Sequence, residues 1–118
     1  MPATTGDYEI PDDNSILVLD DDAPFRNRLS RALTHRGFEV NAVETVTEAM
    51  VVAKSNPPAF AVLDMRLEDG NGLTVVEALH QNRPDCKMVM LTGYGNLATA
   101  VHAIKAGAID YLAKPADA

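Results

Sequence analysis

The stretch Ile16-Leu17-Val18-Leu19-Asp20-Asp21-Asp22 decides the fold that we expect for this sequence. A short, continuous apolar run is typical of a β-strand that is covered on both faces, as in a parallel sheet. The run ends in carboxylates, and Pro24 follows at a place where proline fits the first turn of a helix. The stretch therefore predicts a buried strand, an acidic strand end and a helix, in that order.

The same alternation continues along the chain. Further strands are predicted at residues 38–42, 60–63, 88–91 and 109–113. Helical spacing of apolar residues predicts helices after Pro24, after Thr45 or Thr47, from Leu73 to near Arg83, and around Leu97 to Ile104 with Gly107 as C-cap. Residues 64–72 are predicted to form a polar loop. Strands that alternate with helices imply an α/β fold with right-handed crossovers. We expect a doubly wound, flavodoxin-like sheet of five parallel strands in the order 2-1-3-4-5.

Length and composition limit the classes of protein that fit. The 118 residues suit one domain, which we place at residues 15–118, behind a flexible polar leader at residues 1–14. No apolar run is long enough for a membrane span, so a cytoplasmic location is expected. A net charge of −7 argues against direct binding of nucleic acid by this domain. The single cysteine, Cys86, excludes an internal disulfide.

Polar residues follow four of the predicted strands. Asp20 and Asp21 follow the first strand, Asp64 the third, Thr92 the fourth and Lys114 the fifth. Because the carboxyl ends of parallel strands meet at one edge, we expect these side chains to converge there. Crowded carboxylates repel one another, and a hard divalent cation such as Mg²⁺ relieves the repulsion.

The converging groups predict phosphoryl transfer. Asp64 is the expected nucleophile, Asp20 and Asp21 hold Mg²⁺, and Thr92 and Lys114 bind phosphoryl oxygens. Taken singly, each residue has an ordinary structural interpretation, since aspartate and threonine after strands often cap helices and lysine is usually solvated. The placement of all these residues at the ends of neighbouring strands favours a role in phosphoryl transfer over these structural interpretations. Asp22 is expected to cap the following helix.

Four motifs resemble those of response regulator receiver domains over about residues 15–115. They are Leu17-Val18-Leu19-Asp20-Asp21-Asp22, Val62-Leu63-Asp64, Met90-Leu91-Thr92-Gly93 and Asp110-Tyr111-Leu112-Ala113-Lys114-Pro115. The resemblance implies that Asp64 takes its phosphoryl group from a phosphohistidine of a sensor histidine kinase. It also implies that the domain is a self-catalysed phosphoryl acceptor and not a turnover enzyme.

The resemblance assigns further roles. Asp21 would bind Mg²⁺ directly and Asp20 largely through water, while Arg66 would offer its backbone carbonyl to the metal. Tyr111 would be the switch aromatic that responds to phosphorylation. Gly72 matches a loop glycine of the family.

The sequence also departs from the family pattern. Glu68 stands where a proline is usual, which bears on the loop shape. The usual fifth helix is missing after Lys114-Pro115, so part of one sheet face is expected to lack cover. Within the family, the motifs look like those of the RegA/PrrA/ActR group of redox-responding transcription regulators. That group implies a DNA-binding output domain beyond this chain, and a homodimer is possible.

Two alternatives stay open at this point. A stand-alone receiver would act by binding a protein partner. A haloacid-dehalogenase-type phosphatase would use Asp20 as nucleophile and Asp22 as acid/base.

Overall fold

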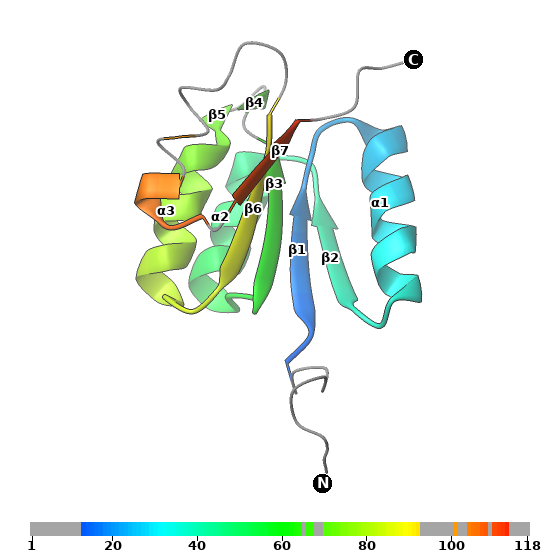
Figure 1. The fold of residues 1–118 in the computed structure, drawn as a ribbon, viewed down its shortest axis with the longest axis horizontal. Helices are drawn as coiled ribbons and strands as arrows, with labels where there is room; N and C mark the ends of the chain where they lie inside the picture. The colour runs from blue at the N-terminus through cyan, green and yellow to red at the C-terminus, as the bar shows by residue number, and fades with distance from the viewer. Residues whose placement is uncertain are drawn as a thin grey trace, which may run out of the picture.

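The fold is an α/β sandwich around a parallel sheet (Figure 1). The structure is a computed structural model, and it describes residues 13–64, 66–67, 70–92, 101, 104–108 and 110–113. The sheet has the order β2-β1-β3-β6-β7, and all of its strand pairs are parallel. The predicted α/β class with a parallel sheet is confirmed.

The strands lie close to their predicted positions. The bounds are β1 Ser15–Leu19, β2 Glu39–Val43, β3 Phe60–Asp64, β6 Lys87–Thr92 and β7 Asp110–Ala113. Every residue of β1 from Ile16 onward is buried, as the continuous apolar run predicts for a strand with neighbours on both edges and cover on both faces. β2 is an edge strand with no fully buried residue, which fits its mixed sequence Glu-Val-Asn-Ala-Val.

Three helices have bounds close to those predicted, and two of them begin at predicted capping residues. α1 spans Ala23–His35, α2 Val46–Ser55 and α3 Gly72–Asn82. The Asp22 carboxylate accepts a hydrogen bond from the N–H of Phe25, so the predicted cap of α1 is confirmed. Thr45 caps α2, since its hydroxyl accepts from the N–H of Glu48. Of the predicted fourth helix, Val101 and Ile104–Ala106 are helical, and the rest lies outside the described residues. Gly107 follows that segment with a φ of +133°, where glycine is favoured.

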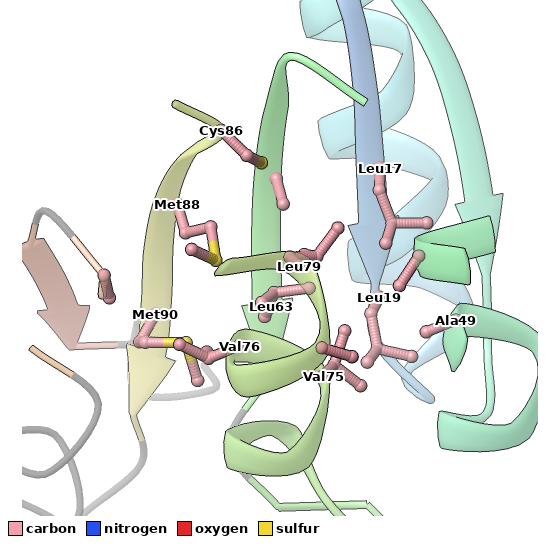
Figure 2. Close-up of a cluster of buried hydrophobic side chains, with 14 of the residues drawn as sticks. Leu17, Leu19, Ala49, Leu63, Val75, Val76, Leu79, Cys86, Met88 and Met90 are labelled. Atoms are coloured by element: carbon pink, nitrogen blue, oxygen red, sulfur yellow. The ribbon is translucent and has the colours of Figure 1, made fainter. Parts of the chain in front are cut away.

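The main core lies between the sheet and the helix pair α2 and α3. Leu17, Leu19, Leu63, Met88 and Met90 point from the strands toward this layer. Figure 2 shows Val75, Val76 and Leu79 of α3 facing them. Burial of these side chains, each worth roughly 1.5–3 kcal/mol, holds α3 in register with the carboxyl end of β3.

The opposite face of the sheet is less completely covered. α1 lies on this side (Figure 1), and it has no fully buried residue. Val62 and Val89, which pair across β3 and β6, are only half-buried. The two faces of the sheet therefore differ: one packs against a closed core, and the other is partly open in the part of the chain that the structure describes.

The loop after β3 differs from the prediction. We expected a polar loop over residues 64–72, but Arg66–Leu67 (β4) pairs antiparallel with Gly70–Asn71 (β5). The prediction was wrong because polarity says nothing about pairing between residues so close in sequence. Glu68, the departure from the family pattern, lies outside the described residues.

A polar clamp joins three connections at the amino end of the sheet. Arg83 forms an ion pair with Asp13 at 2.7 Å and donates to the carbonyl of Pro57. Asp13 in turn accepts from both the N–H and the hydroxyl of Ser15, and Ser15 Oγ accepts from the N–H of Ala59. Asp13, which the sequence assigned to the leader, is thus tied to the folded domain.

Candidate functional site

Three carboxylates meet at the carboxyl end of the sheet. One oxygen from each of Asp20, Asp21 and Asp64 lies within 4.8 Å of the other two. Asp20 is fully buried and Asp64 is 6% exposed, whereas Asp21 is exposed. The prediction that acids from the first and third strands come together is therefore confirmed for these residues. The side chain of Asp22 instead caps α1.

Backbone contacts hold Asp20 in place. Its N–H donates to the carbonyl of Val43 on β2 at 3.2 Å, which extends the sheet by one residue. Its Oδ1 accepts from the N–H of Asp22 at 2.9 Å, and its carbonyl accepts from Arg26 Nη1 at 2.7 Å. The β1–α1 turn is thus built around the Asp20 peptide groups, and the acid that follows it, Asp21, emerges toward solvent.

Gly72 lies against the backbone of Asp64. A Cβ placed on Gly72 would lie 2.2 Å from the carbonyl oxygen of Asp64 and 3.3 Å from Cε of Met90. Only a residue without a side chain allows the start of α3 to approach the end of β3 so closely. Gly72 was predicted to matter through the family resemblance alone, and its contact with the Asp64 backbone is the physical reason.

The strand register places the backbone of Thr92 at the same edge. Asp64 pairs with Leu91, so Thr92 lies one residue further along β6, and Thr92 pairs with Ala113 of β7. Lys114, which directly follows Ala113, lies outside the described residues. Tyr111 belongs to β7 and pairs with Met90, and Arg66 belongs to β4.

The arrangement has a definite chemical capacity. Three carboxylates crowded at a partly buried edge repel one another, and a divalent cation with oxygen preference relieves that repulsion. The donor set therefore fits a hard divalent metal. Arg26 was not predicted to belong to this site, because nothing in the sequence distinguishes it from a surface arginine on an amphipathic helix.

Cys86 takes no part in this site. The side chain is buried in the core at the start of β6, and burial raises the pKa of its thiol to about 11. A thiol with that pKa is almost wholly protonated at neutral pH, and thiolate chemistry requires the deprotonated form.

A parallel α/β domain with an acidic cluster at its carboxyl edge fits a phosphoacceptor signalling domain, and the similarities to known proteins support this class. A model of the response regulator receiver domain family matches residues 16–118. The chain is 58% identical to the photosynthetic apparatus regulatory protein RegA of Rhodovulum sulfidophilum over 112 residues, which are 95% of this chain and 61% of that protein. It is 57% identical to the acid tolerance regulatory protein ActR of Rhizobium meliloti over 106 residues, which are 90% of this chain and 55% of that protein.

A solved structure agrees as well. The crystal structure of a response regulator protein from Burkholderia pseudomallei, with a phosphorylated aspartic acid, a calcium ion and citrate, superposes with a TM-score of 0.81. The two chains are 39% identical, and the matched region covers 89% of this chain and 62% of the Burkholderia protein.

This chain belongs to the response regulator receiver domain family, whose members are regulatory domains of two-component systems and not turnover enzymes. Within it, the chain is close to RegA and ActR. It spans roughly three fifths of the length of these relatives. No helix among the described residues is long and apolar enough to cross a membrane.

Proposed function

We propose that this chain accepts a phosphoryl group on Asp64, with Mg²⁺ held by the carboxylates of Asp20 and Asp21. The observation that carries the proposal is the clustering of these three carboxylates within 4.8 Å, at the carboxyl ends of adjacent strands. When bound, Mg²⁺ would neutralise negative charge on the carboxylates and on the incoming phosphoryl group.

The donor would be a phosphohistidine of a sensor histidine kinase. A carboxylate oxygen of Asp64 attacks phosphorus, the P–N bond breaks, and its electron pair leaves with the imidazole. The product is an acyl phosphate on Asp64. Thr92 and Lys114 would bind the phosphoryl oxygens, and the pairing of Thr92 with Ala113 supports their placement beside each other. Tyr111 would report the switched state from β7.

The β4–β5 pair supports a role for the Arg66 carbonyl. Leu67 pairs with Gly70 across a two-residue connection, so this pair exchanges the hydrogen bonds that close the hairpin. In an antiparallel ladder the next pair, Arg66 with Asn71, does not exchange hydrogen bonds. The Arg66 carbonyl is therefore directed away from β5, as a metal ligand requires.

Further parts of the proposal concern the domain and the whole protein. We propose a receiver at residues 15–118 with five strands in the order 2-1-3-4-5, which the family match to 16–118 and the pairing of β7 with β6 support. We propose that the whole protein regulates transcription through a separate DNA-binding domain; the relatives RegA and ActR are regulatory proteins by name. A cytoplasmic location, and a homodimer as one way of signalling, belong to the same proposal. The phosphatase alternative is set aside, since the chain belongs to the receiver family.

The first test locates the phosphoryl group. The purified chain is treated with acetyl phosphate and Mg²⁺, and its intact mass and proteolytic peptides are measured. We expect one added phosphoryl group on Asp64 and none on the Asp64→Asn variant. A stable label on Asp64→Asn, or a label on Asp20, would contradict the assignment.

The second test concerns the metal. Asp21→Ala should weaken Mg²⁺ binding strongly, because Asp21 is a member of the cluster. Asp22→Ala should cost about 1 kcal/mol of stability through the lost helix cap but leave Mg²⁺ affinity nearly unchanged. Equal losses of affinity in a Mg²⁺ titration would show that the cluster does not define the metal site.

A further inference from the structure

The side chain of Arg26 reaches back to the metal-site turn. Arg26 lies in the second turn of α1, and its own N–H donates to the carbonyl of Asp22 at 2.8 Å. Its half-buried guanidinium donates through Nη1 to the carbonyl oxygen of Asp20 at 2.7 Å. One residue therefore holds two carbonyls of the same short turn.

The carbonyl oxygen of Asp20 belongs to the peptide unit that joins Asp20 to Asp21. These are the two residues proposed to hold Mg²⁺. The orientation of that peptide plane determines where the Asp21 carboxylate lies relative to the Asp20 carboxylate, because the plane is rigid. Arg26 holds the plane at its oxygen, while the N–H of Asp22 holds Oδ1 of Asp20.

Repulsion among the carboxylates opposes this arrangement. Asp20, Asp21 and Asp64 have oxygens within 4.8 Å of one another. Without a metal, their mutual repulsion therefore favours a β1–α1 turn in which the carboxylates are further apart. A hydrogen bond from a charged guanidinium is stronger than one between neutral groups. Arg26 can therefore keep the two carboxylates together before the cation arrives.

We propose that Arg26 is a positioning residue, which preorganises the Asp20–Asp21 peptide for binding of a divalent cation. This inference rests on the proposed function of the same site. The direction in which Mg²⁺ affinity changes when Arg26 is removed tests the proposal. Arg26 is itself a cation near the metal site, so its charge alone would repel Mg²⁺. Removal of Arg26 tightens Mg²⁺ binding if only charge matters, and weakens it if positioning matters.

The experiment compares Mg²⁺ dissociation constants, measured from amide chemical shifts of residues 20–23 in the purified chain at constant ionic strength. We expect Arg26→Ala to bind Mg²⁺ roughly tenfold more weakly than wild type, the lower end of the range for residues that orient metal ligands. Arg26→Lys, which keeps the charge and a donor, should recover part of the loss. The matched control is Arg28→Ala, which removes the same charge from an exposed position on α1. It should bind as tightly as wild type or slightly more tightly.

A second measurement needs no metal. The N–H of Asp22 donates to Asp20 Oδ1, so loosening of the turn should speed amide exchange at Asp22 in Arg26→Ala but not in Arg28→Ala. If Arg26→Ala does not fold, Arg26→Gln takes its place, and we expect weaker Mg²⁺ binding there as well.

The outcomes separate the two proposals. Affinity in Arg26→Ala or Arg26→Gln equal to or tighter than wild type overturns the positioning role and leaves the proposed function intact. A wild-type chain that binds no Mg²⁺ and is not labelled on Asp64 overturns the proposed function, and the role of Arg26 with it.

Discussion

Gly72→Ala should damage both stability and phosphorylation, because the new Cβ would lie 2.2 Å from the carbonyl oxygen of Asp64. Carbon and oxygen atoms in ordinary contact are more than about 3 Å apart, so either α3 or the end of β3 must move by roughly 1 Å. The obstacle is backbone, and no side-chain rotamer can relieve it. Overpacking of this kind costs about 1–3 kcal/mol, and sometimes more.

A helix propensity gain works in the opposite direction. Alanine is better than glycine within a helix by up to about 1 kcal/mol, and less at the first helical position. The net loss in the free energy of unfolding is therefore about 1–2 kcal/mol. For a chain of this size, that corresponds to a fall of roughly 3–12 °C in the melting temperature.

Phosphorylation should suffer separately from stability. A displacement of about 1 Å at a reacting group can slow a reaction by about a hundredfold, so we expect acetyl phosphate to label Gly72→Ala at least roughly tenfold more slowly than wild type. Thermal unfolding by circular dichroism and labelling followed by intact mass measure the two effects. Thr74→Ala, an exposed change in the same first turn of α3, is the control for helix propensity. A Gly72→Ala variant as stable and as rapidly labelled as wild type would refute the reasoning.

Two other predictions follow from shifted pKa values. Hydrogen bonds from Ser15, then from Arg83, lower the pKa of Asp13 from 3.8 to about 2, so the stability that this carboxylate contributes is fully present above its ordinary pKa and is lost as the pH falls through about 2. Asp13→Asn should remove that part of the acid dependence in urea unfolding measured across this range, and an unchanged dependence would contradict the prediction. Burial raises the pKa of Cys86 to about 11, so iodoacetamide should label the native chain far more slowly than the urea-unfolded chain at neutral pH; equal rates would show that the thiol is accessible.

The sequence alone determined the class of fold and the identity of the acidic site. The spacing of apolar residues and the length of apolar runs carried this information, since a continuous apolar run such as residues 16–19 suits only an element covered on both faces. Asp20 and Asp64 could be singled out because each follows such a run, and parallel strands end at a common edge. Local capping was also readable, as Asp22 shows, because a cap bonds to backbone within three residues.

Only the tertiary structure decided how the site is held together. Pairing of β4 with β5 depends on backbone geometry that a polar stretch does not specify. Gly72 lies against the backbone of Asp64 because the fold brings the start of α3 next to the end of β3. Composition cannot distinguish such a glycine from an ordinary loop glycine. Arg26 looks like any surface arginine on an amphipathic helix, until the turn from β1 into α1 places the Asp20 carbonyl within reach of its guanidinium. Such contacts depend on distances in space, and a linear pattern records only distances along the chain.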